Sequence, residues 1–197
     1  MKTIQNAILL TFVLFSITTI SCSRRAAPSA PKMDPSALSA RALELYDTDK
    51  NGKIDGKELD ATPALAFSLR ELDANRDKGL DADEIRTRLE AWNASGVTLM
   101  SPNFSCKVAG KTVKEGTLKL TPDPFMGSAF PSAQGEFLNG ACQPAAPNPG
   151  NYQAIPLGFY SVEVSSPQGN IPPGKLGVEV FEGSQYFQKN GEYRLSF

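Results

Sequence analysis

Apolar and polar positions follow one period in the first half of this chain and another period in the second half. Between residues 35 and 92, apolar side chains recur at helical spacing, most clearly at Ile85, Leu89 and Trp92. After residue 92, short runs alternate at every second position, as strands with one buried face do. These runs are 117–120, 159–164, 176–180 and 193–197. The pattern predicts an α+β chain, in which a small helical unit precedes an all-β unit.

We expect the two units to be separate domains, at residues 35–92 and 105–197, with a linker at 93–104. Turn signals such as Ala109-Gly110 bound the alternating runs, which is typical of a β-sandwich. About 95 residues are enough to bury one such core. Trp92 lies on the apolar stripe of the last helix and is predicted to be a core residue.

The first residues have the pattern of a targeting segment. Residues 1–21 carry one charge and an apolar run too short to span a bilayer, which predicts a signal peptide. The run ends in Ser21-Cys22, which resembles a bacterial lipobox, although Thr19 stands where leucine is usual. This resemblance implies lipidation of Cys22, a membrane anchor and a place in the cell envelope or periplasm. The alternative is an ordinary secretory signal with an incidental cysteine.

Residues 22–34 are rich in alanine, proline and serine, which predicts a disordered tether between the anchor and the folded part. Three cysteines occur in the chain. If Cys22 carries the lipid, Cys106 and Cys142 remain, and an oxidising compartment would let them form a disulfide worth about 3–4 kcal/mol. The alternative is two free buried thiols.

Oxygen-bearing side chains are concentrated in residues 47–58 at the spacing of a calcium-binding loop. Calcium takes six to eight oxygen ligands, and such a loop supplies them from one short segment. Gly52 lies at the sharp turn, where a residue without Cβ adopts positive φ at little cost. The expected ligands are Asp47, Asp49, Asn51, the Lys53 carbonyl, Asp55 and Glu58.

Residues 73–84 repeat this pattern with one departure. Lys78 occupies the turn position, and the glycine is displaced to Gly79. A lysine there either adopts the left-handed conformation, which costs on the order of 1 kcal/mol, or the turn shifts and a ligand is lost. The expected ligands are Asp73, Asn75, Asp77, the Gly79 carbonyl, Asp81 and Glu84.

Together the two loops and their flanking apolar residues resemble an EF-hand pair over residues 35–92. The resemblance implies Ca²⁺ as the bound ion, with one strong site and a second, weaker site. It also implies a short two-stranded ladder through Ile54 and Leu80, which occupy the same loop position. The short segment between the loops resembles compact bacterial pairs. Dockerin modules match less well, because residues 64–72 can form a helix entering the second loop.

The second half resembles transthyretin-like or carboxypeptidase-regulatory-like sandwiches in two segments. Residues 108–118 are similar to the opening hairpin of these domains, and residues 156–164 to their late P-x-G-x-Y-x-V-x-V strand. Gly116 departs from the usual alanine. Such domains generally have no catalytic role, so the resemblance implies a module that binds or presents an envelope protein or polysaccharide. A generic immunoglobulin-like sandwich is the alternative.

Composition excludes several classes of function. The chain has no histidine and a net charge of −1, so histidine-dependent catalysis is impossible and nucleic acid is not an expected partner. The remaining acids, such as Asp123 and Glu163, are interpreted as scattered, solvated positions, and no enzyme is expected. A calcium sensor is the alternative function. It is disfavoured because no methionine lies within 35–92 to line a target groove.

Overall fold

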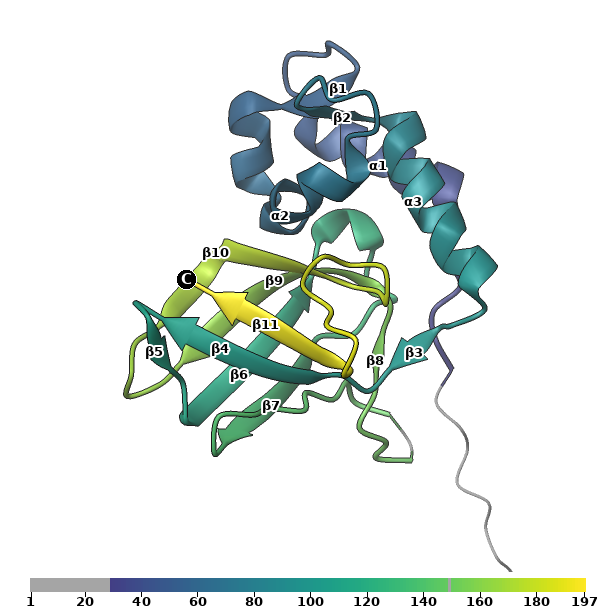
Figure 1. Cartoon of the computed structure of the whole chain (residues 1–197). Helices are drawn as coiled ribbons and strands as arrows, with labels where there is room; N and C mark the ends of the chain where they lie inside the picture. Colours follow the sequence, from purple (N-terminus) through teal and green to yellow (C-terminus); the bar gives the residue numbers. More distant parts are fainter. Residues whose placement is uncertain (1–28, 149) are drawn as a thin grey trace, which may run out of the picture.

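The computed structural model describes residues 29–148 and 150–197 and has a mixed α+β architecture (Figure 1). The predicted signal peptide, Cys22 and most of the predicted tether lie outside these residues. Among the described residues, no helix has the length and apolar character needed to cross a membrane.

Helices make up the first part of the described chain. Their boundaries agree with local capping signals, since Asp34 accepts hydrogen bonds from the amides of Ser36 and Ala37 at the start of the first helix. The last helix ends at Gly96, which adopts the left-handed conformation. The helical segments are α1 (Pro35–Tyr46), the 3₁₀ segment η1 (Gly56–Ala61), α2 (Pro63–Leu72) and α3 (Ala82–Ser95).

Two short strands pair between the helices. β1 (Lys53–Asp55) and β2 (Gly79–Asp81) are antiparallel, with Ile54 opposite Leu80. Both of these side chains are fully buried. The predicted two-stranded ladder is therefore confirmed, and it joins the two acidic loops back to back.

The second part of the chain consists of two larger sheets. A four-stranded antiparallel sheet has the order β10-β9-β6-β7, and a three-stranded sheet has the order β11-β4-β5, in which β11 and β4 are parallel. The small strands β3 and β8 form a separate pair. The strands are β3 (Leu99–Met100), β4 (Asn103–Val108), β5 (Lys111–Thr112), β6 (Glu115–Pro122), β7 (Ala133–Leu138), β8 (Ile155–Pro156), β9 (Gly158–Ser165), β10 (Ile171–Val180) and β11 (Glu192–Ser196).

One apolar core lies between the two larger sheets. It takes Phe104 from β4 and Tyr193 from β11, whose rings stack with centroids 4.8 Å apart, and alternate residues such as Val162 and Val178 from the four-stranded sheet. The four predicted alternating runs fall within or overlap β6, β9, β10 and β11. Their alternation is explained by this core, because each strand points every second side chain into it.

A second apolar core extends through both parts of the chain. Trp92 from α3 is fully buried there, and its ring lies 4.9 Å from the ring of Phe159 and 6.1 Å from that of Phe181. Phe125, from the 3₁₀ segment η2 (Pro124–Met126), packs against Phe159 in the same cluster. The prediction that Trp92 is a core residue is confirmed. Its partners, however, come from the β part, so the helices do not enclose a core of their own.

Residues expected to form a linker are built into this arrangement. α3 continues to Ser95, Met100 in β3 pairs with Ile155 in β8, and β4 begins at Asn103. The described chain therefore has three layers in the region of β9 and β10: helices, the four-stranded sheet and the three-stranded sheet (Figure 1).

Helix α2 lies directly on β10 at a glycine. A Cβ atom placed on Gly177 would lie 2.3 Å from the backbone N and Cα of Ala64, closer than any real contact. Both Ala64 and Leu65 are fully buried at this contact. The absence of a side chain at Gly177 is what lets the helix backbone reach the sheet.

We expect Gly177→Ala to lower the free energy of unfolding by about 3 kcal/mol, because the added methyl group must displace α2. Urea unfolding followed by circular dichroism measures the loss. Gly174→Ala in the same strand is the control, since its Cβ would meet nothing within 4 Å and only its φ of 78° opposes alanine; it should lose about 1 kcal/mol. Equal losses would contradict the close packing of α2 on Gly177.

Candidate metal centre

The two acidic loops leave their helices with the same backbone geometry. The amide of Asp47 donates to the carbonyl of Leu43 at 2.9 Å, and the amide of Asp73 donates to the carbonyl of Leu69 at 2.8 Å. Both aspartates have a ψ of 85°. The first predicted ligand of each loop is thus placed by the last turn of the preceding helix.

The turn of the second loop keeps the register of the first. At the fourth loop position Lys50 has a φ of 61° and Arg76 a φ of 63°; at the sixth, Gly52 has 88° and Lys78 has 71°. Of the two outcomes open from the sequence, Lys78 therefore adopts the left-handed conformation and the turn does not shift. At this turn position the second loop bears the free-energy cost of a non-glycine residue at positive φ, which Gly52 avoids in the first loop.

The first aspartate of each loop accepts hydrogen bonds from the amides of the turn. Asp47 accepts from Asn51 at 3.1 Å and from Gly52 at 2.9 Å. Asp73 accepts from Asp77 at 3.1 Å and from Lys78 at 2.9 Å. These matched contacts hold both loops in a tight turn with the carboxylates directed inward.

The closing glutamates also occupy equivalent positions. Glu58 accepts from the Thr48 amide at 2.6 Å and the Asp55 amide at 3.2 Å, so it spans the first loop. Glu84 does the same in the second loop, accepting from Ala74 at 2.9 Å and Asp81 at 3.1 Å. A further hydrogen bond from Thr48 Oγ1 is the largest of several contributions that lower the pKa of Glu58.

Three acids of the first loop come together in a cluster that fits one cation. Carboxylate oxygens of Asp47, Asp49 and Glu58 all lie within 4.8 Å of one another. Oxygens bound to the same Ca²⁺ at about 2.3–2.6 Å lie at most about 5 Å apart. Spacing and donor type in the first loop therefore both suit a hard divalent cation.

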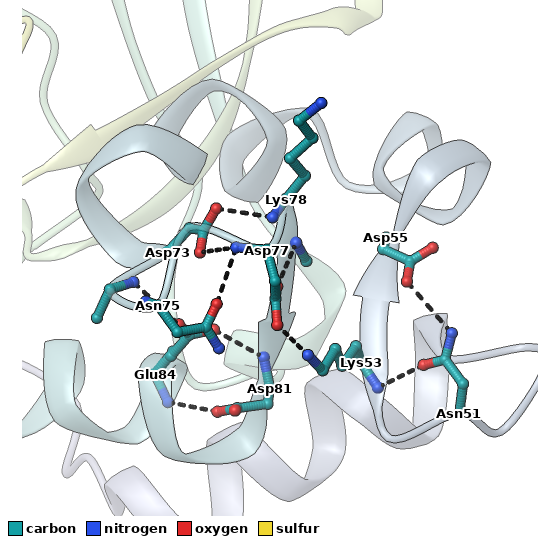
Figure 2. Close-up of polar contacts among 11 residues, drawn as sticks. Asn51, Lys53, Asp55, Asp73, Asn75, Asp77, Lys78, Asp81 and Glu84 are labelled. Carbon is teal, nitrogen blue, oxygen red and sulfur yellow. Dashed lines mark hydrogen bonds and ion pairs between the residues drawn. The ribbon is translucent and has the colours of Figure 1, made fainter.

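The other predicted side-chain ligands of the first loop adjoin this cluster. Asn51 donates its side-chain amide to Asp49 at 3.3 Å. It also donates to Asp55 at 3.2 Å, and its side-chain oxygen accepts from the Lys53 amide at 2.8 Å (Figure 2). All the predicted ligands of residues 47–58 thus belong to one connected hydrogen-bonded loop.

The second loop differs in its charge balance. The ammonium group of Lys53, in the first loop, reaches across the β1–β2 pair and forms an ion pair with Asp77 of the second loop (Figure 2). This contact lowers the pKa of Asp77 and raises that of Lys53. A positive charge therefore already neutralises one of the predicted ligands of residues 73–84. Only the backbone carbonyl of Lys53 was expected to have a role.

Both remaining cysteines are free, buried thiols, so the expected disulfide is absent from this structure. The backbone of Cys142 pairs with Phe104, which places Cys106 at the diagonal position two residues along β4. Diagonal partners are typically about 7–8 Å apart, beyond the usual reach of a disulfide. Burial raises the pKa of Cys106 to about 11 and that of Cys142 to about 12, which favours the protonated thiol over the thiolate.

Two acids outside the loops have positions that the sequence did not indicate. Asp123 was interpreted as solvated but is 4% exposed, and Glu179 is 1% exposed. Glu179 accepts from Arg88 at 2.6 and 2.7 Å and from the Trp92 indole at 2.8 Å. Strand alternation places Glu179 and Gly177 on one face of β10, and only the helices covering that face make it an interior. No local sequence signal distinguishes these residues.

Comparisons with known proteins gave no relatives: no family model, no curated protein and no solved structure matches the chain. The functional assignment therefore depends on the residues of this chain and their geometry.

We expect Lys78→Gly to raise the free energy of unfolding by about 1 kcal/mol, because glycine adopts the left-handed conformation without a Cβ clash. Chemical unfolding in the presence of a chelator isolates this effect from any bound ion. Lys57→Gly is the matched control: Lys57 lies within η1 and does not itself have a positive φ, so glycine there should destabilise. A destabilised Lys78→Gly variant would contradict the turn geometry.

Proposed function

We propose that residues 35–92 form an EF-hand pair that binds Ca²⁺, and that the ion stabilises an exported, lipid-anchored envelope protein. The observation that carries this proposal is the shared geometry of the two loops, in which matched carboxylates hold matched turns. In the first loop they accompany a cluster of carboxylate oxygens. An accidental acidic surface would not repeat the same hydrogen bonds twice at the same offsets.

The donor chemistry favours calcium over other cations. Carboxylates, an amide and backbone carbonyls are hard oxygen ligands, which suit Ca²⁺ better than the metals that prefer nitrogen or sulfur. Residues 47–58 would hold the first ion and residues 73–84 the second. When bound, the ion would cancel the mutual repulsion of the carboxylates and so tighten each loop against its helices.

The second site is proposed to be the weaker of the two. Its turn requires Lys78 at positive φ, and its ligand Asp77 is already paired with Lys53. An entering ion would compete with Lys53 for this carboxylate and bind near a positive charge. Neither condition applies to the first loop, where the turn residue is Gly52.

A structural role for calcium is favoured over a sensor role by the second apolar core. Sensors open their helices on binding calcium and expose an apolar groove for a target. Here the apolar side of the helices is already covered by Phe125, Phe159 and Phe181 of the same chain. In addition, extracellular modules bind at about 10⁻⁴–10⁻³ M, so a site with that affinity would be largely filled where calcium exceeds that concentration.

The β part is proposed to be a transthyretin-like module that binds or presents an envelope protein or polysaccharide. The two sheets with a common core support this assignment. No catalytic role is proposed, because the chain contains no histidine and its densest acids belong to the two loops. Anchoring is proposed on the pattern around Cys22.

Calcium is expected to raise the melting temperature of the purified protein. One site filled at 100 times its Kd adds about 2.7 kcal/mol to the free energy of unfolding. Calorimetry in calcium and in chelator measures the shift. Glu58→Gln should remove most of it, since it deletes the closing ligand of the stronger loop, whereas Glu163→Gln on β9 is a control that should leave it intact. Equal melting temperatures in calcium and chelator would refute calcium binding.

Lipid anchoring is tested on the amino terminus of the mature protein. We expect mass spectrometry of material from bacterial membranes to show a chain that begins at Cys22 and carries acyl groups. Cys22→Ser should release the protein from the membrane fraction, while Cys106→Ser should not. An unmodified mature terminus upstream of Cys22 would rule out the anchor.

A further inference from the structure

Asp123 belongs to the β part of the chain, but it contacts both segments that flank the first loop. We call these segments the arms of the loop: the end of α1, which enters it, and the residues after η1, which leave it. One carboxylate oxygen accepts from the hydroxyl of Tyr46 at 2.5 Å, and the other accepts from the hydroxyl of Thr62 at 2.6 Å. The first oxygen also accepts from the amide of Phe125 at 3.3 Å. All three side chains of this cluster are buried.

One hydroxyl donor precedes the first loop in the sequence, and the other follows it. Tyr46 is the last residue of α1 and directly precedes the ligand Asp47. Thr62 follows η1, the segment that carries the closing ligand Glu58. A single carboxylate therefore joins the segment that enters the loop to the segment that leaves it.

The direction of these hydrogen bonds is set by the surroundings. Both hydroxyl groups donate, because the carboxylate oxygens of Asp123 can only accept. Burial raises the pKa of Asp123, while the two hydroxyl donors act in the opposite direction. Leaving a buried polar group without a hydrogen-bond partner costs more free energy than losing a solvent-exposed hydrogen bond. The Asp123 carboxylate therefore holds its two donors firmly in place.

We propose that Asp123 is a positioning residue for the first calcium loop: it holds the Tyr46 and Thr62 arms at the separation at which Asp47 and Glu58 share one ion. This inference is based on the proposed function. A loop that already populates its binding geometry does not spend binding free energy on ordering, so its apparent affinity is higher. Asp123 is held in turn by η2, whose Phe125 and Met126 are anchored in the apolar core.

A second buried acid provides a contrast within the same chain. Glu179 accepts hydrogen bonds from Arg88 and Trp92 of α3, the helix that follows the second loop. It contacts neither arm of the first loop through a hydrogen bond. Any general loosening of the junction between helices and sheet should affect both loops, whereas loss of Asp123 should act on the first loop.

The test is calorimetric titration of the full chain with calcium alone. A Glu84→Gln background removes the closing ligand of the second loop, so the first loop is measured separately. Asp123→Ala and Tyr46→Phe should each weaken calcium binding, the former by about tenfold, which is a usual size for coupling between sites. Asp123→Asn should recover most of the affinity, because its amide accepts from Tyr46 and donates to the Thr62 hydroxyl.

Tyr160→Phe is the matched control. It removes another buried tyrosine hydroxyl, which donates to the carbonyl of Pro156 at 3.0 Å within the β part. We expect it to lower the melting temperature in chelator without changing the calcium affinity. A purely structural role for Asp123 would make its variants behave in the same way as this control.

The possible results distinguish failure of the positioning role from failure of calcium binding. If Asp123→Ala does not fold, as judged by circular dichroism in chelator, Tyr46→Phe decides, since it removes a single hydrogen bond. Binding by the Tyr46→Phe and Asp123→Ala variants at the parent affinity would overturn the inference and leave calcium binding intact. If the parent chain takes up no calcium, the proposed function fails and the inference with it.

Discussion

Helix α2 and strand β10 approach each other so closely at Gly177 that backbone meets backbone, and this contact sets how near the helices lie to the sheet. With α2 held there, α1 and α3 cover the remaining apolar surface of β9 and of η2. The outer face of the sheet becomes an interior, in which Phe159 and Trp92 pack together. A residue larger than glycine would separate these layers and expose both sides.

The burial of that face explains why two acids can lie inside the protein. A buried carboxylate is costly unless its oxygens accept hydrogen bonds. Glu179 has Arg88 and Trp92 as donors, and Asp123 has Tyr46 and Thr62. Each acid belongs to the β part, and the side chains that donate to it belong to the helical part of the chain. The polar contacts therefore specify how the two parts align, while the apolar core provides most of the adhesion.

This arrangement gives a consistent picture of what calcium would do. The helical part of the proposed EF-hand pair is joined to the β part through Asp123 and through Glu179. The apolar surface of its helices therefore packs against the same chain and is not available to a partner. An ion bound in the first loop would then stabilise the junction rather than switch it. That role suits the proposed anchored protein outside the cytoplasm, where a calcium-rich medium would keep the ion bound as part of the fold.

Much of the local structure was determined by the sequence alone: the loops, the Ile54–Leu80 ladder, the alternating strands and the buried Trp92. These features depend on neighbouring residues, whose spacing dictates turns, caps and faces. Only the tertiary structure decided that Gly177 and Glu179 face helices instead of water, that Asp123 joins two arms of a loop, that Lys53 pairs with Asp77 and that the cysteines are free. Each of these depends on which distant segment covers a given face, and side-chain alternation is the same whether that face meets solvent or protein.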